Sequence, residues 1–528
     1  MIAETIAEPD LNQRVNFSIV TPVYNPDRKA FEACVRSVRE QSYPHWEWCL
    51  VDDRSTNWWV WPRLKMLSLL DRRIKVKRRS VNGGISNASN DALGLVSGDY
   101  IALLDNDDEL DIDALAVVNH HIVHHPNVDY LYSDEDKIAE SGGYEGRFSK
   151  PDWSPERLLC QNYCSHLSVI RSQLVQELGG FRSEYDGAQD HDLLLRLADS
   201  ELAVLHIPEV LYHWRVAEGS TAADVSEKPE AVNAGRRAVE DAVARREING
   251  TVVDAGSWYH RVKRSPTSTP LVSLIIPTCG TEGVIWGERV VFAENFVASI
   301  NDLSTYENYE VVVVYDDGTD PLMLDRLRAS TRRCRLVPYR KPFNFSEKCN
   351  IGAVESSGDV LIFVNDDMEV LSPDWVDTLV AMTEDPTVGA AGPMLLFDNF
   401  TIQSAGHHAV GPGHFARGLS PKSPAAGGWP LVLNREVSGL TGACIALRRE
   451  VFFQIGGFSE QLPLNYNDVD FGYKIQSEGL RLLWTPDATL FHFESKSRET
   501  NVSDEEKELL RRLWGRFISG YSTDPYLP

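Results

Sequence analysis

The stretch Ser97–Leu110, SGDYIALLDNDDEL, carries the pattern from which the fold can be predicted. Its apolar run, Tyr100–Leu104, is short enough for a buried strand rather than a helix. The run stops abruptly in a group of carboxylates. In open α/β sheets, ligands bind in the crevice outside the carboxyl ends of the strands. Asp105 and Asp107 are therefore candidate ligands of one hard divalent cation, and an acidic surface turn is the alternative.

A second stretch, Ser357–Val370 (SGDVLIFVNDDMEV), repeats this design about 260 residues later. Other features recur in the same order: Gly179-Gly180-Phe181 returns as Gly456-Gly457-Phe458, and His213 returns as His492. The spacing between matched points widens along the chain, as insertions in loops of the second copy would cause. The period is far too long for a solenoid repeat. The sequence therefore predicts a duplication of whole domains.

Upstream of the first stretch, strand-like and helix-like segments alternate with short connections. Such alternation predicts an α/β fold with a mostly parallel sheet and helices on both faces. Asp27 is a candidate N-cap for the first helix. The first theme restarts at Leu271–Thr278. We predict an N-terminal tail (1–15), a first domain (16–221), a helical linker (222–270), a second domain (271–500) and a C-terminal helix and tail (501–528).

The length and composition of the chain exclude several classes of protein. With 528 residues, the chain is too long for one ordinary core. The net charge of −25 argues against a nucleic-acid partner, because phosphates would be repelled. The acidic segment Met1–Asp10 lacks the features of a signal peptide, and no apolar run approaches the ~18 residues of a membrane span. The eight cysteines are scattered, without zinc-site spacing. We expect a cytoplasmic protein.

Three strand ends of the first domain should meet at one crevice, and their residue types suit a nucleotide. Tyr24 offers a ring face to a base, Asp52-Asp53 can accept hydrogen bonds, and Asp107 can hold a metal against a diphosphate. A packed aromatic residue and an ordinary acidic turn are the respective alternatives. No Gly-x-Gly-x-x-Gly motif follows the first strand and no Gly-Lys-Ser/Thr loop occurs, which disfavours a dinucleotide oxidoreductase and a P-loop NTPase.

Taken in order, the motifs resemble those of the inverting GT-A glycosyltransferases of family 2, which have a Rossmann-like fold. The second domain resembles a different branch of that family. The resemblance covers about 16–220 and 271–498, and the tandem arrangement is similar to bacterial enzymes that build O-antigen, capsule or rhamnan-type glycans. The motifs are TPVYN (21–25), VDDRS (51–55), NGGISNASN (82–90), DGAQDHD (186–192), LYHWR (211–215), KPFNFSEKCN (341–350), TGAC (441–444), NDVD (467–470) and HFESKSR (492–498).

For the first domain the resemblance implies specific roles. Asp105 and Asp107 would hold Mg²⁺ or Mn²⁺, His213 would approach the same metal, and Asp190 would be the general base. Gln189 replaces the usual glutamate beside that base. For His213, a satisfied core histidine is the alternative. The implied nucleotide-binding residues are Thr21, Pro22, Tyr24, Asp52, Asp53, Asn82, Gly84, Asp105 and Asn106.

In the second domain Asp468 matches the base, and Asn365, Asp367 and His492 match the metal ligands. Asn365 stands where the first domain has Asp105, and a neutral amide is a weaker ligand. We therefore predict that the first domain holds the surer metal site. Asp192 and Asp470 are interpreted as charges that interact with a helix dipole. The implied nucleotide-binding residues are Pro277, Asp316, Asp317, Asn344 and Asp366.

The leading hypothesis is a bifunctional enzyme that uses UDP-, dTDP- or GDP-sugars and a glycan or lipid-linked glycan acceptor. In one alternative a single domain is catalytic and the other binds glycan or a partner. A sugar-nucleotide pyrophosphorylase is disfavoured, because Pro22–Pro26 is not its glycine-rich loop. The apolar residues of 509–518 recur at helical spacing, which indicates either docking onto a core or peripheral contact with the inner face of a membrane.

Overall fold

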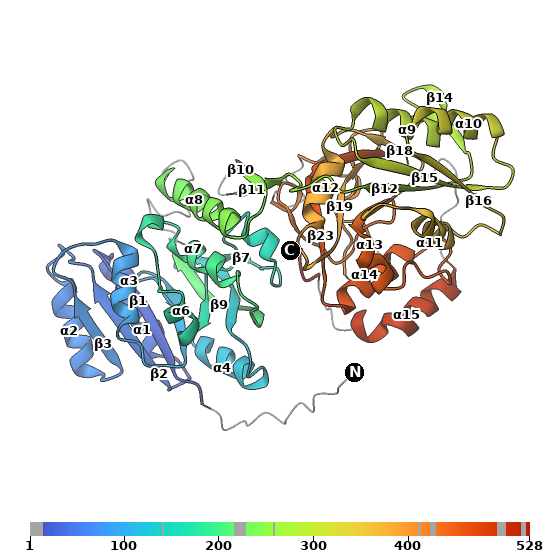
Figure 1. The fold of residues 1–528 in the computed structure, drawn as a ribbon. Helices are drawn as coiled ribbons and strands as arrows, with labels where there is room; N and C mark the ends of the chain where they lie inside the picture. Colours follow the sequence, from blue (N-terminus) through green and yellow to red (C-terminus); the bar gives the residue numbers. More distant parts are fainter. Residues whose placement is uncertain are drawn as a thin grey trace. The chain divides into compact units, whose positions relative to one another are not determined.

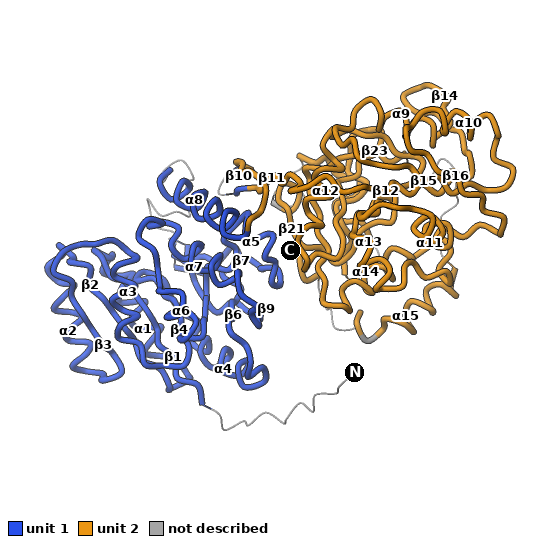
Figure 2. Tube along the Cα trace, in the orientation of Figure 1, with its two compact units in different colours: residues 1–246, 256–260 blue, residues 247–255, 261–528 orange. Residues whose placement is uncertain are grey.

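The computed structural model forms two compact units, residues 1–246 with 256–260 (unit 1) and 247–255 with 261–528 (unit 2) (Figure 2). Most of the predicted N-terminal tail, residues 222–228 of the predicted linker and residues 494–498 of the last motif lie outside the described residues. The described residues are 14–139, 142–215, 229–256, 259–409, 413–422, 429–493, 503–518 and 524–527.

Unit 1 is built on one mixed sheet whose first four strands are parallel. Strand β4 then pairs antiparallel with β8, and β6 runs parallel to β9. The strand order is β3 (Ile74–Arg78), β2 (Trp46–Asp52), β1 (Phe17–Val23), β4 (Tyr100–Leu103), β8 (Ser168–Arg171), β6 (Tyr130–Ile138), β9 (Val204–Arg215) and β5 (Glu109–Leu110), with β7 (Tyr144–Phe148) beside β6.

Helices alternate with these strands as the sequence predicts (Figure 1). The Asp27 side chain accepts hydrogen bonds from the amides of Lys29 and Ala30, so it is the N-cap of α1. The helices are α1 (Arg28–Arg39), α2 (Val60–Leu70), α3 (Ile85–Leu93), α4 (Ala114–His124), α5 (Pro155–Leu158), α6 (Ser172–Glu177), the 3₁₀ turn η1 (Ser183–Tyr185), α7 (Gln189–Leu197) and α8 (Pro229–Arg245).

Unit 2 repeats this topology strand for strand, which confirms the predicted duplication of an α/β domain. Its order is β16 (Cys334–Tyr339), β15 (Tyr309–Asp316), β12 (Val272–Thr278), β17 (Val360–Val364), β22 (Cys444–Arg448), β19 (Val388–Leu396), β23 (Arg481–His492) and β18 (Met368–Val370), with β20 (Ile402–Ser404) and β21 (Arg435–Glu436) alongside.

Each face of the second sheet is buried under its own set of helices. Along β12, Leu274 and Ile276 enter one apolar core and Ile275 enters the other, because side chains alternate along a strand. One core contains residues of α9 (Phe292–Leu303), α10 (Pro321–Ser330) and α12 (Trp375–Thr383). The other contains residues of α11 (Phe345–Glu355), α13 (Arg449–Gln454) and α14 (Asn467–Ser477).

The segments outside the two sheets attach to one unit or the other. Helix α8, within the predicted linker, packs against α7, and Asp241 of α8 forms an ion pair with Arg182 at 2.6 Å. The linker also forms a hairpin of β10 (Gly250–Asp254) and β11 (His260–Arg264). In α15 (Asp504–Ile518), Trp514 donates to Asp470 at 2.8 Å, so the docking alternative is the one observed.

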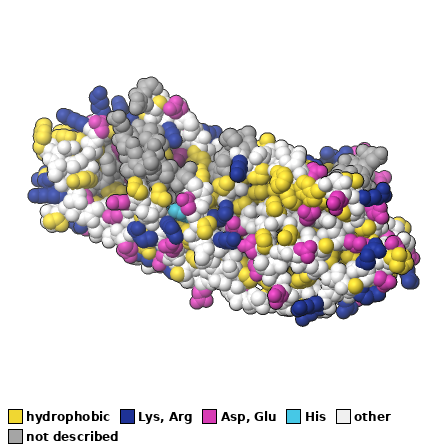
Figure 3. Space-filling model, turned by 90° about the horizontal axis from the view of Figure 1, so that it is seen from above, with side chains coloured by type: hydrophobic (Ala, Val, Ile, Leu, Met, Phe, Trp, Pro, Cys, Tyr) yellow, Lys and Arg dark blue, Asp and Glu magenta, His cyan; other side chains and the backbone are white. Residues whose placement is uncertain are grey.

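The surface carries both charged and hydrophobic side chains. Acidic and basic side chains are mixed over the face shown in Figure 3. Among the helices in the described part of the chain, none is long and apolar enough to cross a bilayer.

Candidate active site

A cavity of about 240 Å³ lies in unit 2 where the strands β12 and β17 end. It collects residues that are far apart in the sequence, from the ends of two strands, the start of α14 and the end of β23. Ligand sites of α/β sheets occupy this position. Six predicted site residues line it: Pro277, Asn365, Asp366, Asp367, Asp468 and His492.

Three of these residues form a compact donor set. The Nε2 atom of His492 lies 3.3 Å from Asp367 Oδ1 and 3.3 Å from Asn365 Nδ2, the nitrogen of the side-chain amide. Strand pairing fixes the arrangement, because Met368 lies opposite His492 and the Phe493 amide donates to the Asp367 carbonyl at 2.9 Å. A carboxylate, an amide oxygen and an imidazole are suitable ligands for a divalent cation.

Asp468 lies in the same cavity, in the first turn of α14. Its carboxylate accepts hydrogen bonds from the amides of Gly442 at 3.0 Å and Val469 at 2.9 Å. Burial raises the pKa of Asp468 above its ordinary value, and the two amides and His414 oppose that rise. A carboxylate with a raised pKa is a stronger base, which suits proton abstraction.

The other predicted nucleotide-binding residues of unit 2 have protein partners. Asp366 accepts from the Thr278 hydroxyl at 2.6 Å. Asn344 caps α11 by accepting from the Glu347 amide at 3.0 Å, so it acts there as a helix N-cap. Asp316 ends β15 and Asp317 follows it, and like Asn344 neither lines the cavity described above.

Lys348 is a cavity residue that sequence reasoning missed. Its side chain is only 1% exposed, and Nζ lies 2.7 Å from the Thr278 carbonyl and 2.8 Å from Asp316. It thereby joins the ends of β12 and β15. Its position on α11, on the same helix face as the buried residues Phe345 and Gly352, is the signal that could have identified it.

Replacing Lys348 by methionine is expected to lower the free energy of unfolding of unit 2 by about 1–3 kcal/mol. The substitution keeps the packing volume but leaves Asp316 and a buried carbonyl without their cation. Hydrogen exchange of unit 2 amides would measure the loss. The matched control is Lys341→Met, whose exposed side chain pairs with Glu347. That change should stay within about 0.5 kcal/mol, and an equal effect of both changes would contradict the assigned role of Lys348.

Unit 1 has a smaller cavity, of about 50 Å³, at the corresponding strand ends. The predicted residues Pro22, Asp105 and Asp190 line it, together with Gln189. Asp190 accepts a hydrogen bond from Asn162 Nδ2 at 2.8 Å. The cavity of unit 1 therefore brings together Asp105, a predicted metal ligand, and Asp190, the predicted base.

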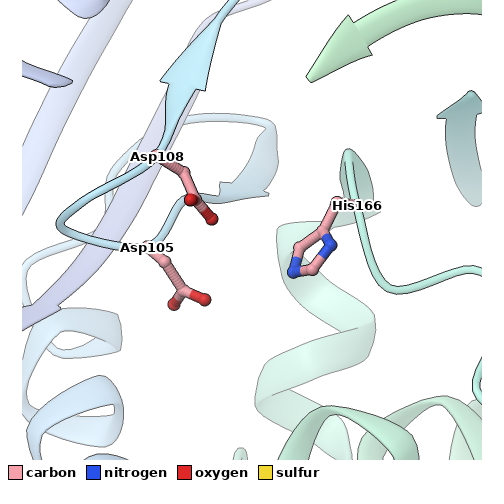
Figure 4. A group of neighbouring side chains, drawn as sticks. All are labelled: Asp105, Asp108 and His166. Carbon is pink, nitrogen blue, oxygen red and sulfur yellow. The ribbon is translucent and has the colours of Figure 1, made fainter. Parts of the chain in front are cut away.

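The candidate metal ligands that lie together in unit 1 are not the predicted set of Asp105, Asp107 and His213. Ligand atoms of Asp105, Asp108 and His166 lie within 4.8 Å of one another, and both carboxylates are directed towards the imidazole (Figure 4). Burial raises the pKa of Asp105 to about 6. Burial opposes a charge on His166, but Glu135, Asp108 and Asp105 raise its pKa to about 9. His166 is thus a cation at neutral pH and neutralises part of the group.

Asp108 has a structural role within this group. Its two oxygens accept hydrogen bonds from the Tyr212 hydroxyl at 2.6 Å and the Arg215 amide at 2.7 Å. Burial raises its pKa well above the ordinary value. Asp108 therefore fastens the turn after β4 to the end of β9, and Asp105 is the better placed ligand.

His213 and Asp107 do not join Asp105 in such a group. His213 donates from Nδ1 to the Asp136 carboxylate at 2.6 Å and stacks on Tyr144 at 3.9 Å between ring centroids. The physical reason is strand alternation: the neighbouring Tyr212 faces the cavity and stacks on His166, so His213 points to the other side of β9.

The strand-end residues predicted to hold a nucleotide in unit 1 lie close together. Asp53 accepts hydrogen bonds from the amides of Gly83 and Gly84, each at 2.9 Å, and Asn82 donates to the Asp53 carbonyl at 3.2 Å. Gly84 has a φ of +88°, a conformation that glycine adopts without strain. Asp52 forms an ion pair with Arg78 at 2.9 Å.

Three further predicted nucleotide-binding residues lie at these strand ends of unit 1. Thr21 is buried and accepts from Trp48 Nε1 at 2.9 Å, whereas Tyr24 is 48% exposed and offers its ring to solvent. Asn106 donates to the Pro22 carbonyl at 3.1 Å, which ties the acidic turn to the end of β1.

Asp192, two residues after the predicted base, is structural. It is fully buried and forms ion pairs with Arg182 and, at 2.9 Å, with Arg196. Asp192→Ala is expected to lower the free energy of unfolding of unit 1 by about 3–5 kcal/mol, because two guanidinium groups lose a buried partner. Hydrogen exchange of unit 1 would measure it. The control, Asp199→Ala, breaks partly exposed pairs with Arg245 and Arg246 and should lose about 1 kcal/mol or less.

Each unit thus combines a mixed, parallel-rich sheet, acids directly after the fourth strand and a carboxylate that enters the same crevice from a later helix. This combination defines a glycosyltransferase of the GT-A fold, here present twice. The chain belongs to glycosyl transferase family 2, whose family model matches residues 18–179 and 273–456, more than half of the chain.

Three relatives extend this result. An uncharacterized protein, y4gI, of Sinorhizobium fredii is 39% identical over 94% of this chain and 55% of its own length. The O-antigen biosynthesis protein RfbC of Myxococcus xanthus is 34% identical over 98% of this chain and 40% of its own length. The chain thus spans about half the length of these relatives. The Escherichia coli enzyme WfgD, a UDP-Glc:alpha-D-GlcNAc-diphosphoundecaprenol beta-1,3-glucosyltransferase, is 27% identical over 38% of this chain and 78% of its own length.

Proposed function

We propose that the protein is a bifunctional inverting glycosyltransferase that transfers sugars from nucleotide-sugar donors to a growing cell-surface glycan. The observation that carries the proposal is the cavity of unit 2, where Asn365, Asp367 and His492 lie beside Asp468. The O-antigen relative supports the glycan class. The diphosphoundecaprenol substrate named for WfgD supports a lipid-linked acceptor, which would bring the protein to a membrane surface.

In the proposed reaction of unit 2, Asp468 takes the proton of the acceptor hydroxyl. The acceptor oxygen attacks the anomeric carbon of the donor from the face opposite the nucleotide. The bond between that carbon and the diphosphate oxygen breaks, the electron pair leaves with the nucleoside diphosphate, and the configuration inverts. Mg²⁺ or Mn²⁺, held by Asn365, Asp367 and His492, would supply Lewis-acid stabilisation of the leaving diphosphate. In unit 1, Asp190 would act as the base and Asp105 as a ligand of the cation.

A reducing compartment suits this chain. The eight cysteines are thiols rather than disulfides, and Cys34, Cys49, Cys349 and Cys444 are among the buried ones. Disulfides are rare in the cytoplasm, where nucleotide sugars are available as donors. We therefore propose that the protein acts at the cytoplasmic side of the membrane.

A donor screen tests the proposal. Purified protein with Mn²⁺ is incubated with UDP-, dTDP- and GDP-sugars, and release of nucleoside diphosphate is measured with and without glycan acceptors. At least one donor is expected to be hydrolysed or transferred. Failure with every donor of the panel would contradict the proposal.

The alternative is that only unit 2 is catalytic and unit 1 binds a glycan or a partner. Two observations favour it: the cavity of unit 1 is about 50 Å³ against about 240 Å³, and neither Asp107 nor His213 joins Asp105 in its group of candidate ligands. Linkage analysis of the product separates the two candidates, because two active units form two linkages.

A further inference from the structure

Two aromatic side chains of unit 2 project from loop tips although the backbone there favours another residue. Trp286 and Gly287 form the two-residue turn between β13 (Glu282–Ile285) and β14 (Glu288–Val291), with φ values of +52° and +87°. Two positive φ values are typical of a type I′ turn, in which Asn-Gly is strongly preferred. Phe400, at the turn between β19 and β20, has a φ of +63°. Bulky residues rarely adopt this conformation, and such strain points to a function.

These two rings belong to a cluster of four, which we call the aromatic platform: Trp286, Phe400, Phe491 and Phe493. The Trp286 ring lies 6.1 Å from Phe400, 5.1 Å from Phe491 and 5.7 Å from Phe493 between centroids. Phe491 and Phe493 are buried, whereas Trp286 is 50% and Phe400 57% exposed. The platform therefore presents two aromatic rings to solvent on a packed base.

A polar anchor fixes the Trp286 ring. Its Nε1 donates to Glu369 at 3.1 Å, and Asn295 donates to the same carboxylate at 3.2 Å. The ring is thus held before any ligand arrives, which reduces the entropy lost on binding. A fixed apolar ring beside a carboxylate matches the two sides of a sugar, because the C–H face of a pyranose can stack on the ring while hydroxyl groups donate to the carboxylate.

The platform adjoins the donor set of the unit 2 cavity. Phe491 and Phe493 flank His492, the last residue of β23, and Glu369 on the edge strand β18 is two residues from Asp367. Since side chains alternate along a strand, the platform lies on the opposite side of β23 from His492. A chain of several sugars that leaves the cavity over the β18 edge would reach it.

The charged side chains around the aromatic platform indicate which kind of ligand can bind there. The hairpin contributes Glu282 and Glu288 against a single Arg289, and Glu369 adds another carboxylate. This acidic surrounding disfavours an anionic lipid surface or an anionic polysaccharide. Unit 1 has no counterpart of the hairpin, because only four residues, 24–27, separate β1 from α1.

We propose that the aromatic platform binds a neutral saccharide of the acceptor chain, several sugars away from the reacting hydroxyl, and so makes unit 2 selective for long acceptors. The inference rests on the proposed function for its acceptor, but the platform can be tested by binding alone.

The test uses Trp286→Asn, which creates the preferred turn sequence and is expected to keep or raise the melting temperature. Binding of the full chain to an array of neutral bacterial O-antigen oligosaccharides is expected to weaken about tenfold, the loss of one good aromatic contact. In transfer assays KM should rise for long acceptors alone, with kcat and the donor KM unchanged. Phe400→Asn should act in the same way, and Phe453→Ala, on α13 and 47% exposed, is the control.

Three outcomes would overturn the inference: a wild-type protein that binds no oligosaccharide of the array, Asn variants that bind as the wild type does, or variants that lose only binding to phosphatidylglycerol vesicles or self-association. Absence of donor turnover would instead contradict the proposed function and leave the array result standing. If Trp286→Asn fails to fold, Phe400→Asn decides.

Discussion

Replacing Asp468 by asparagine is expected to lower transfer by unit 2 about 10²–10⁴-fold. Asparagine has nearly the same shape and its carbonyl can still accept from the Gly442 amide, which lies 3.0 Å from the carboxylate. It cannot take a proton, and that is the contribution of a general base. Rates with each acceptor, followed by linkage analysis of the product, measure the effect.

Stability separates this effect from misfolding. Burial raises the pKa of Asp468, so its charged form is disfavoured in the folded protein. Replacing it by a neutral amide should therefore leave the melting temperature unchanged or raise it. A variant that is inactive and also unstable would not support a role as base.

The raised pKa also sets a pH dependence. Asp468 acts as a base only when ionised, so the acid limb of kcat/KM for unit 2 should lie above the pH at which an ordinary aspartate titrates. The same sign applies to stability: a carboxyl whose folded pKa is raised removes stability as pH rises from its unfolded towards its folded pKa. A profile with its acid limb at or below the ordinary aspartate range would contradict the assignment.

Asp190→Asn is the matched change in unit 1. If both units are catalytic, it abolishes a different linkage by a similar factor. If Asp190→Asn leaves every linkage intact while Asp468→Asn removes one, unit 1 is a binding module. Intact linkages in both variants would contradict the role of these aspartates as bases.

Much of the fold could be predicted from the sequence because its signals are local. A short apolar run followed by acids identifies a buried strand with a functional end, as Tyr100–Leu104 and Val360–Val364 do. A second occurrence of the same order identifies the duplication. The identical strand orders of the two sheets confirm it.

The composition of the unit 1 acidic group could not be predicted, because it depends on register. The pairing of β6 with β9 shifts at two points, between Ser133 and Asp134 and between Asp134 and Glu135. Each shift changes which side chains face the cavity, and no sequence pattern marks them. His166 belongs to no recognisable motif, and its charge arises from Glu135, 31 residues away in sequence.

The prediction that unit 1 holds the surer metal site compared residue types, Asp105 against Asn365. The structure adds a second factor, the geometry. In unit 2 the histidine at the end of β23 lies beside both strand-end ligands, whereas His213, which the sequence motifs matched to it, pairs with Asp136. Asn365, the weaker type of ligand, therefore belongs to the group whose side chains lie closer together, that of unit 2.

Removal of divalent cations is accordingly expected to have its largest effect on unit 2. Dialysis against EDTA should lower its transfer rate about 10³-fold, the several kcal/mol that a Lewis acid contributes to leaving-group stabilisation, and Mn²⁺ should restore it. Asp367→Asn should raise the Mn²⁺ concentration needed for half-maximal rate, because the set loses its carboxylate. Asn365→Asp should lower that concentration, because it adds a second charge to the cation site.

Binding of Mn²⁺ measured by calorimetry provides a readout that does not depend on transfer. Asp367→Asn should weaken it and Asn365→Asp should strengthen it, whereas Asp317→Asn, an exposed acid outside the cavity, should leave Mn²⁺ binding unchanged. Full activity of EDTA-treated protein would contradict a cation at this site. Equal Mn²⁺ affinities of wild type and Asn365→Asp would place the cation elsewhere, because a carboxylate added to its ligands should raise the affinity.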